Sequence, residues 1–351
     1  MSVPKKNQLV GLDIGSHSVK LVEIDDSKKG LILKNFGIIG LPQNAIVEGS
    51  VKEMEIVSAA IKNLYKNLKI KNKNVATSIS GYSVIVKKIS IDQREESELE
   101  STIHEEAEQY IPFDISDVNL DFQILGESES NPNQMNVFLV AAKKAMLDDY
   151  INMMNLAGLN PCIFDVESFA LQNSFEASYD AQNQDVALID IGASKTSLNI
   201  LKNAASVFMR DVSLGCGQIN QKIMSLIECS FEEAEQLKYG NTPDKLSPDD
   251  LKGIVSSVVA DWCTEIRRAL DFFYSTYPED RIKRIILSGG GANIGEFRDL
   301  LATEASADVE MINPFQNFFI ENKKLDEAFI KQVAPQAAIC MGLAMRKVDD
   351  K

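Results

Sequence analysis

Two short segments, far apart in the chain, share one pattern: an apolar run that ends in Asp-Ile-Gly. The first is LVGLDIGSHSVKLVEID over residues 9–25, and the second is VALIDIGASKTSLNIL over residues 186–201. Each pattern predicts a buried strand that turns tightly at glycine and returns as a second strand, with an acidic side chain at the turn. Two such turns that face each other would form a clamp for phosphate groups.

The residues at the two turns indicate which groups such a clamp would hold. Gly15 and Gly192 allow the backbone to approach a ligand closely, so that amide N–H groups can point at phosphate oxygens. Asp13 and Asp190 would repel those oxygens, and a Mg²⁺ ion with bound water between them would remove the conflict. We therefore predict that Asp13 and Asp190 hold Mg²⁺ through water.

A third segment, RIKRIILSGGGANIGEFRDLL over residues 281–301, combines an apolar strand, three consecutive glycines and an amphipathic helix. Gly289, Gly290 and Gly291 leave room for a flat base or a ribose. A glycine cluster after a strand does not identify a nucleotide site on its own. Because it follows the two Asp-Ile-Gly segments in order, the three segments together predict such a site.

In this order the segments resemble the ATPase superfamily that includes actin, the heat-shock chaperones and the sugar kinases. Ser16 and Lys20 follow Asp13 by three and seven residues, as the phosphate-contacting serine and lysine do in actin. The resemblance implies an α/β, two-lobed actin-like (ribonuclease H-like) ATPase fold with ATP and Mg²⁺ as cofactors. It also implies that Ser16, Lys20 and Thr196 contact the nucleotide.

Within the superfamily, the chain resembles the PilM family of type IV pilus assembly proteins over residues 9–346. The resemblance rests on the two Asp-Ile-Gly segments and on FMRDVSLGCGQINQKI, FEEAEQLKYG and APQAAICMGLAMR. Like FtsA, this family carries an inserted 1C subdomain where actin carries its subdomain 2. The resemblance predicts subdomain 1A at 9–82 and 161–185, 1C at 83–160 with a β-α-β-β-α pattern, 2A at 186–218 and 269–346, and 2B at 219–268.

The resemblance also assigns roles to carboxylates outside the turns. In the superfamily, the helix that returns from 1C delivers the residue that orients the attacking water, and here Asp165 or Glu167 is placed to do so. The alternative is that both are charges favoured at a helix N-terminus by the macrodipole. Glu235 and Lys238 share one helix face, which suits a carboxylate on ribose hydroxyls and an ammonium beside the base. Without the family resemblance, this pair would be interpreted as a surface ion pair.

Gly215 and Gly217 lie where relatives carry paired glycines that line the nucleotide site, although Cys216 interrupts the pair in this chain. We expect a backbone turn at this position, with both glycines next to the nucleotide.

The resemblance implies an adaptor function. Its partner would be the cytoplasmic N-terminal peptide of the inner-membrane protein PilN, bound through 1A and 1C, with PilO, PilP and the pilus motor ATPases contacted indirectly. We expect ATP hydrolysis to be slow or dependent on a partner. The alternatives are an FtsA-like cell-division protein and a sugar or acetate kinase, for which no acceptor site is apparent.

Composition narrows the possible partners. The net charge of −15 opposes binding to nucleic acid or to an anionic membrane surface. The five cysteines lack CxxC spacing, and two histidines are too few for a histidine-based zinc site. No signal core or membrane-spanning run is present, so we expect a cytoplasmic protein that reaches the inner membrane only through partners.

Overall fold

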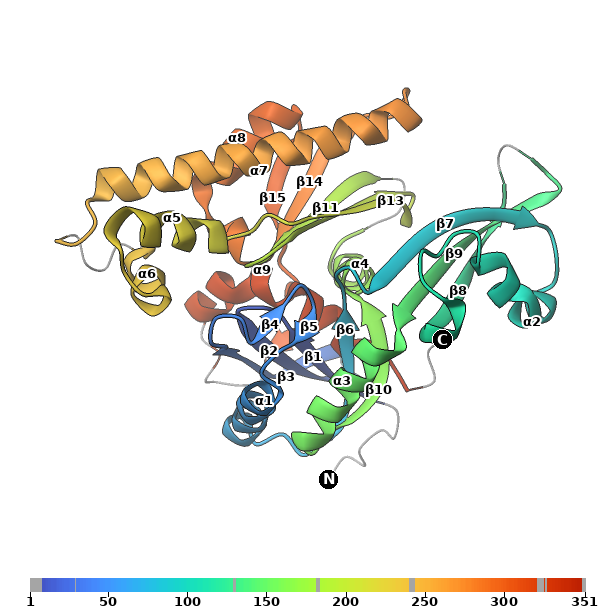
Figure 1. Cartoon of the computed structure of the whole chain (residues 1–351), viewed down its shortest axis with the longest axis horizontal. Helices are drawn as coiled ribbons and strands as arrows, with labels where there is room; N and C mark the ends of the chain where they lie inside the picture. Colours follow the sequence, from blue (N-terminus) through green and yellow to red (C-terminus); the bar gives the residue numbers. More distant parts are fainter. Residues whose placement is uncertain are drawn as a thin grey trace.

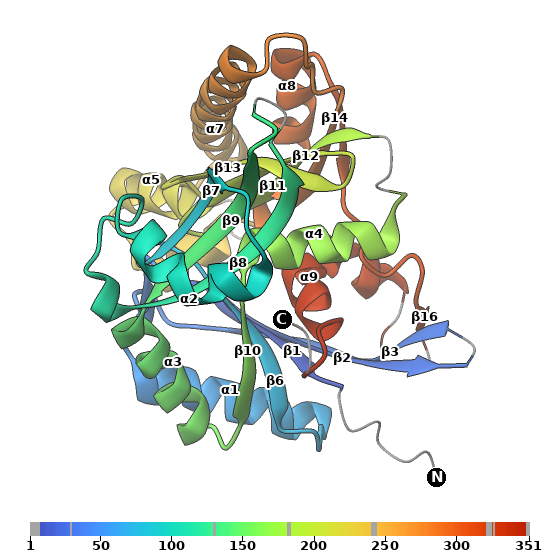
Figure 2. The ribbon, with the colours of Figure 1, turned by 90° about the vertical axis from the view of Figure 1, so that its right-hand side faces the viewer.

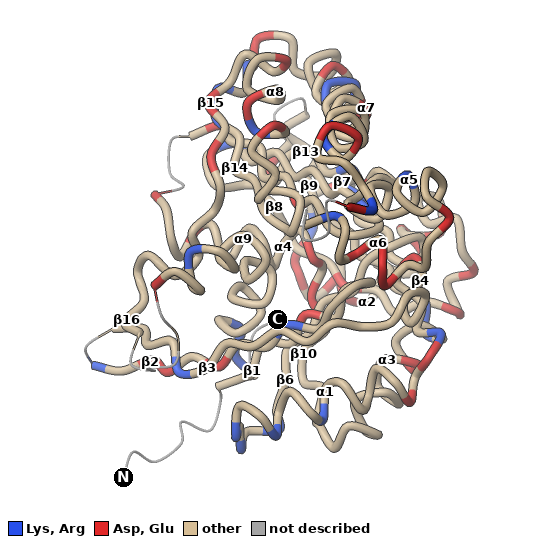
Figure 3. The backbone as a smooth tube through the Cα atoms, turned by 90° about the vertical axis from the view of Figure 1, so that its left-hand side faces the viewer, with Lys and Arg blue, Asp and Glu red and all other residues tan. Residues whose placement is uncertain are grey.

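The computed structural model describes residues 8–28, 30–128, 131–180, 184–239, 244–320, 325 and 327–348. These residues form two lobes, each built around a β-sheet, and a smaller unit beside the first lobe (Figures 1 and 2). Asp and Glu are spread along both lobes, which accords with the net charge of −15 (Figure 3). Among the described residues, no helix is long and apolar enough to cross a bilayer.

The first lobe contains a six-stranded sheet with the order β10-β6-β1-β2-β3-β16. Its central strand β1 is buried along its whole length, and helix α1 packs its apolar face beneath the sheet. The elements are β1 Val10–Ile14, β2 Ser18–Ser27, β3 Gly30–Gly40, β4 Ile46–Val47, β5 Ser50–Val51, α1 Met54–Leu68, β6 Asn74–Ile79, β10 Asn160–Val166 and β16 Phe319–Ile320.

The second lobe contains a five-stranded sheet with the order β13-β12-β11-β14-β15. Its long helix α7 begins with two signals typical of a helix start, since Ser247 caps its first turn and proline occupies the next position. The elements are β11 Asp185–Ile191, β12 Thr196–Lys202, β13 Ala205–Val212, α5 Gly217–Ile227, α6 Phe231–Leu237, α7 Pro248–Thr276, β14 Arg284–Ser288, η2 Gly290–Asn293, α8 Gly295–Ala305 and β15 Asp308–Met311.

The two sheets repeat one arrangement around their central strands. Strand β1 pairs antiparallel with β2 and parallel with β6, and β11 pairs antiparallel with β12 and parallel with β14. Each Asp-Ile-Gly turn therefore follows a central strand at the edge where its parallel neighbour also ends. The predicted two-lobed α/β architecture is confirmed.

The inserted unit, residues 84–143, is a three-stranded antiparallel sheet in the order β7-β9-β8, covered by helix α2. It has a hydrophobic core of its own, formed by buried side chains of helix α2 and of the sheet that it covers. Its elements are β7 Val84–Asp92, α2 Glu96–Ala107, η1 Ile115–Asp117, β8 Val118–Glu127 and β9 Gln134–Lys143.

Helix α3, Lys144–Leu156, differs from the sequence-based grouping, which placed it in subdomain 1C. Its buried side chains, among them Met146 and Met153, join the core of the first lobe beside α1. Tyr150 donates a hydrogen bond to the Gly49 carbonyl, which belongs to that lobe. The apolar face of α3 showed that the helix is buried, but its sequence does not show which sheet it covers.

The C-terminal helix α9, Glu327–Ala344, also departs from its predicted place in subdomain 2A. It packs against β1 and β2 of the first lobe and lies beside α4, Glu167–Ser178 (Figure 2). One buried cluster joins Leu9 of the first lobe, Leu188 of the second lobe and Leu343 of α9. The end of the chain thus fills the space between the lobes.

The close crossing of α9 and α4 generates a test. A Cβ atom at Gly342 would overlap the backbone of Ala170, whereas Gly253 in α7 has open space at that position. We expect Gly342→Ala to lower the free energy of unfolding by about 3 kcal/mol or more, because two helices must separate. Gly253→Ala is the matched control and should raise it by about 0.5–1 kcal/mol. Urea denaturation measures both, and equal effects would contradict this packing.

Candidate functional site

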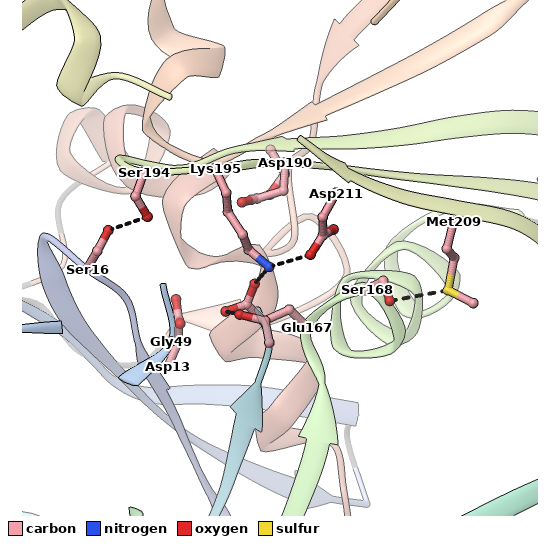
Figure 4. Close-up of polar contacts among 12 residues, drawn as sticks. Asp13, Ser16, Gly49, Glu167, Ser168, Asp190, Ser194, Lys195, Met209 and Asp211 are labelled. Carbon is pink, nitrogen blue, oxygen red and sulfur yellow. Dashed lines mark hydrogen bonds and ion pairs between the residues drawn. The ribbon is translucent and has the colours of Figure 1, made fainter. Parts of the chain in front are cut away.

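The two Asp-Ile-Gly turns face each other across the lobes. The hydroxyl groups of Ser16 and Ser194 are hydrogen-bonded at 3.0 Å, although 178 residues separate them (Figure 4). Each turn is closed in the same way, since the Gly15 amide donates to Ser18 and the Gly192 amide donates to Lys195. The predicted pairing of the turns is therefore present in the structure.

Backbone amides at the tips of these turns are available to a ligand. Within the described ranges of the chain, the amides of Ser16, His17, Ala193 and Ser194 have no hydrogen-bond acceptor. Open N–H groups on two adjacent turns are donors of the kind that can bind phosphate oxygens. This set of donors fits the phosphate chain that the sequence predicts at the turns.

Asp13 and Asp190 end the two central strands and lie at the base of the turns. Burial raises the pKa of Asp13, while Lys20, whose ammonium lies 3.0 Å from Asp13 Oδ2, acts in the opposite direction. Burial also raises the pKa of Asp190 to about 6, and a 2.7 Å hydrogen bond from Ser288 only partly offsets it. A cation between these carboxylates would stabilise their ionised forms.

The donor set fits magnesium better than a fully protein-bound metal. Among the residues that the structure describes, no group of three or more His, Cys, Asp or Glu side chains is able to hold a metal ion by itself. Mg²⁺ commonly binds one or two carboxylates and completes its coordination with water and phosphate oxygens. Asp13 and Asp190 supply such a pair, which supports their predicted role.

Glu167, the first residue of α4, points into the same space. Ser80 donates to its Oε1 at 2.9 Å, and the ammonium of Lys195 lies 2.8 Å from its Oε2 (Figure 4). Asp165 is not brought there, since it lies in β10, where its Oδ2 is 3.6 Å from Arg346 Nη1. Of the two water-orienting candidates, the structure places only Glu167 at the turns.

Lys195 was not singled out from the sequence. It also contacts Asp211 Oδ2, at 3.0 Å. Burial acts to lower its pKa, but Glu167 and Asp211 outweigh that effect and raise it, so the group stays charged. The signal was available in the sequence, because a lysine between Asp190 and Thr196 must lie in the second turn.

The glycines after β13 support the second turn from behind. A Cβ atom at Gly215 would lie 2.7 Å from backbone atoms of Gly192 and Ala193, and one at Gly217 would lie 3.0 Å from the Ala193 carbonyl. The amides of Cys216 and Gly217 donate to the carbonyls of Gly192 and Ala193. These amides are therefore already hydrogen-bonded within the protein. The Thr196 hydroxyl is also engaged, since it donates to the Leu214 carbonyl at 2.9 Å.

The three glycines after β14 have different surroundings. Gly289 has φ +81°, and a Cβ atom there or at Gly291 would overlap Ile191. At Gly290, an added Cβ would meet only the Gln336 amide nitrogen at 3.7 Å. Gly290 is thus the position of the triplet that leaves room for a base or ribose, while its neighbours allow close packing on β11.

Glu235 and Lys238 form an ion pair on α6, with Lys238 Nζ 2.7 Å from both carboxylate oxygens. Glu235 also accepts a hydrogen bond from Asn220, and His17 of the first turn lies 3.5 Å from it. The pair therefore borders the turns across the lobes, as an adenosine contact requires. The contact of His17 with this pair was not predicted.

Comparison with known proteins identifies the wider group. A family model described as type IV pilus assembly protein PilM matches residues 11–348. The solved structure of a PilM-PilN type IV pilus biogenesis complex is similar, with a TM-score of 0.86 and 26% identity, over 98% of this chain and 99% of that chain.

More distant proteins share the fold. EutJ from Carboxydothermus hydrogenoformans has a TM-score of 0.60 at 13% identity, over 98% of this chain and 91% of that chain. MreB5 of Spiroplasma citri bound to AMPPNP has a TM-score of 0.52 at 14% identity, over 94% of this chain and 98% of that chain. The fold is thus that of the actin-like ATPases.

Cell division protein FtsA of Bacillus subtilis (strain 168) is 24% identical over 261 residues, which are 65% of this chain and 57% of FtsA. The match thus spans little more than half of that relative. Because the PilM model covers nearly the whole chain, the cell-division and kinase alternatives are not favoured.

The raised pKa of Asp190 predicts how charge removal affects stability. Its value of about 6 exceeds 3.8, so the folded state binds the proton more tightly than the unfolded state. The charge therefore destabilises the fold above pH 6, and the penalty disappears as pH falls below about 4. We expect Asp190→Asn to raise the free energy of unfolding by up to about 3 kcal/mol at pH 8 and by about half of that at pH 5.

Urea denaturation at both pH values measures this difference. Asp185→Asn, at the outer end of the same strand, is the matched control. A gain from Asp190→Asn that is absent at pH 8, or that is larger at pH 5, would contradict the prediction.

Proposed function

The chain belongs to the PilM family of type IV pilus assembly proteins, and we propose that it acts as an adaptor that binds ATP between its lobes and a peptide of PilN on its inserted unit. The observation that carries this proposal is the meeting of the two turns at Ser16 and Ser194. It brings open backbone amides and two buried carboxylates to one place, and this combination suits phosphates with a divalent cation.

For the nucleotide, each residue of the site has a proposed task. The open amides and Lys20 bind phosphate oxygens, while Asp13 and Asp190 hold Mg²⁺ through water. When bound, the metal neutralises phosphate charge beside the carboxylates. The Glu235–Lys238 pair and the space above Gly290 receive the ribose and base. MreB5 of Spiroplasma citri, which shares the fold, was solved with AMPPNP bound, and this supports the assignment.

Hydrolysis is a separate question from binding. Glu167 is the group placed to orient water, but both of its oxygens are engaged, one by Ser80 and one by Lys195. We therefore propose that turnover is slow until another component of the assembly displaces one of these contacts.

For the peptide, the inserted unit offers a hollow of about 620 Å³. It is lined by Phe113, Ile115, Val118 and charged residues of the inserted unit, together with Lys144 at the start of α3. A mixed apolar and charged hollow of this size suits a short peptide segment. The solved relative is a PilM-PilN complex, and we assign the cytoplasmic N-terminal peptide of PilN to this hollow.

The remaining contacts follow from this partner. We propose that PilN holds the protein at the inner face of the inner membrane, and that PilO, PilP and the pilus motor ATPases are reached through PilN. Such an arrangement needs no anchor in this chain, and the described residues contain no helix that spans a bilayer.

Calorimetry tests the nucleotide site. With protein shown to be free of nucleotide, we expect saturable binding of Mg-ATP, and at least tenfold weaker binding for Asp13→Asn because a charge that attracts the cation is lost. Asp25→Asn, farther along β2 and outside the turns, should bind like the parent chain. A folded, nucleotide-free protein that binds no Mg-ATP would contradict the proposed function.

The peptide hollow is tested by titrating a fluorescent PilN N-terminal peptide. Ile115→Asp places a charge in the hollow and should weaken binding at least tenfold, since an apolar contact is replaced by a desolvated carboxylate. Leu226→Asp replaces an exposed apolar residue of α5 in the second lobe and serves as the control. Unchanged affinity for Ile115→Asp, with intact thermal unfolding, would exclude this hollow as the peptide site.

A further inference from the structure

Lys195 is the charged group at the turns to which the motifs assign no task. It follows Ser194, which contacts the first turn through Ser16. Its side chain is 21% exposed, and its ammonium contacts Glu167 of α4 at 2.8 Å and Asp211 of β13 at 3.0 Å. A single ammonium therefore joins the second turn to α4, which lies between the lobes.

One donor of this ammonium remains open. A lysine ammonium carries three N–H donors, and Glu167 and Asp211 accept two of them. In the part of the chain that the structure describes, no third acceptor contacts the group. Burial removes water from this N–H donor of Lys195, and no protein acceptor replaces the lost hydrogen bond to water. An anionic oxygen from a ligand would satisfy it.

The position of Lys195 along the site indicates which part of a nucleotide it meets. The Glu235–Lys238 pair lies on α6, which borders the first turn through His17. In Figure 4, the contact of Ser16 with Ser194 lies on one side of the Lys195 side chain and Asp211 on the other. Figure 1 places α6 at one end of the second lobe, and α4 lies toward the inserted unit. A phosphate chain that starts beside α6 and crosses the turns therefore ends at Lys195.

Lys20, the lysine of the first turn, has a different place in the site. Lys20 pairs with Asp13 on the first hairpin, 3.0 Å away, and so serves the phosphates held at that turn. Charge-assisted hydrogen bonds to phosphate are among the stronger polar contacts in proteins. The ammonium of Lys195, at the far end of the chain of phosphates, makes such a contact only when a terminal phosphate is present.

We propose that Lys195 binds the terminal phosphate of a nucleoside triphosphate and makes the site prefer a triphosphate over a diphosphate. This inference rests on the proposed nucleotide site. Lys195 acts as a specificity residue, because a diphosphate leaves its third donor unsatisfied.

The test compares affinities for Mg-AMPPNP and Mg-ADP by calorimetry, so that turnover does not interfere. In Lys195→Met, affinity for the triphosphate analogue should fall about tenfold or more, while affinity for ADP should change less than twofold. Lys195→Arg keeps the charge and should retain most of the preference. Lys202→Met is the matched control, because Lys202 lies on β12 but pairs with Asp280 at 2.7 Å, away from the turns.

The outcomes separate the two proposals. If Lys195→Met lowers both affinities equally, or leaves both unchanged, the assignment of Lys195 is overturned while the nucleotide site stands. If the parent chain binds neither ligand, both proposals fail. Thermal unfolding checks that each variant folds, and Lys195→Gln, which keeps an N–H donor without the charge, replaces Lys195→Met if the latter does not fold.

Discussion

The contact between the two Asp-Ile-Gly turns is the interaction on which the rest of the structure depends. It brings Asp13 and Asp190, which end two separate sheets, to the same small volume. Burial raises the pKa of Asp190 to about 6, and the nearby carboxylates of Glu167 and Asp13 add to this effect because like charges repel where water is excluded. Lys20, whose ammonium lies 3.0 Å from Asp13 Oδ2, offsets part of this effect. A site with this balance is suited to bind anions and a cation together.

The fold maintains the contact by joining the lobes behind it. Buried residues of both sheets meet α4 and α9 in one shared cluster, so the lobes are not separate domains linked only by the chain. Gly11 and Gly342 allow backbones to approach closely in this region, since a side chain at either position would overlap its neighbour. Close packing of this kind limits the freedom of the turns, because each turn directly follows a central strand of its sheet.

Local motifs predicted which residues meet at the two turns better than they predicted the packing around them. Asp13 and Asp190 were recognisable because the turn that positions each carboxylate lies within a few residues of it. Helix α3 joins the core of the first lobe and α9 packs against both lobes, which the sequence did not show, since an apolar face indicates that a helix is buried but not which sheet it covers. Gly215 and Gly217 were expected at the nucleotide, whereas their neighbours in space are Gly192 and Ala193 of the second turn. Lys195 was overlooked because its partners are not near it in the sequence. Glu167 lies on α4, and Asp211 is brought close only by the pairing of β13 with β12.

The proposed nucleotide site and the inserted unit are physically connected through Glu167. Its partner Ser80 directly follows β6 and precedes β7, the first strand of the inserted unit, by only a few residues. Tyr82, within that short connection, contacts Ser213 of the second lobe at 3.1 Å. A change in how the lobes and Glu167 are held must therefore be accommodated at the start of β7. The other connection of the inserted unit is Lys144, which lines the hollow and begins a helix buried in the first lobe. A peptide affinity that differs with and without nucleotide requires a coupling between the two sites, and both covalent links of the inserted unit run through residues that contact the lobes.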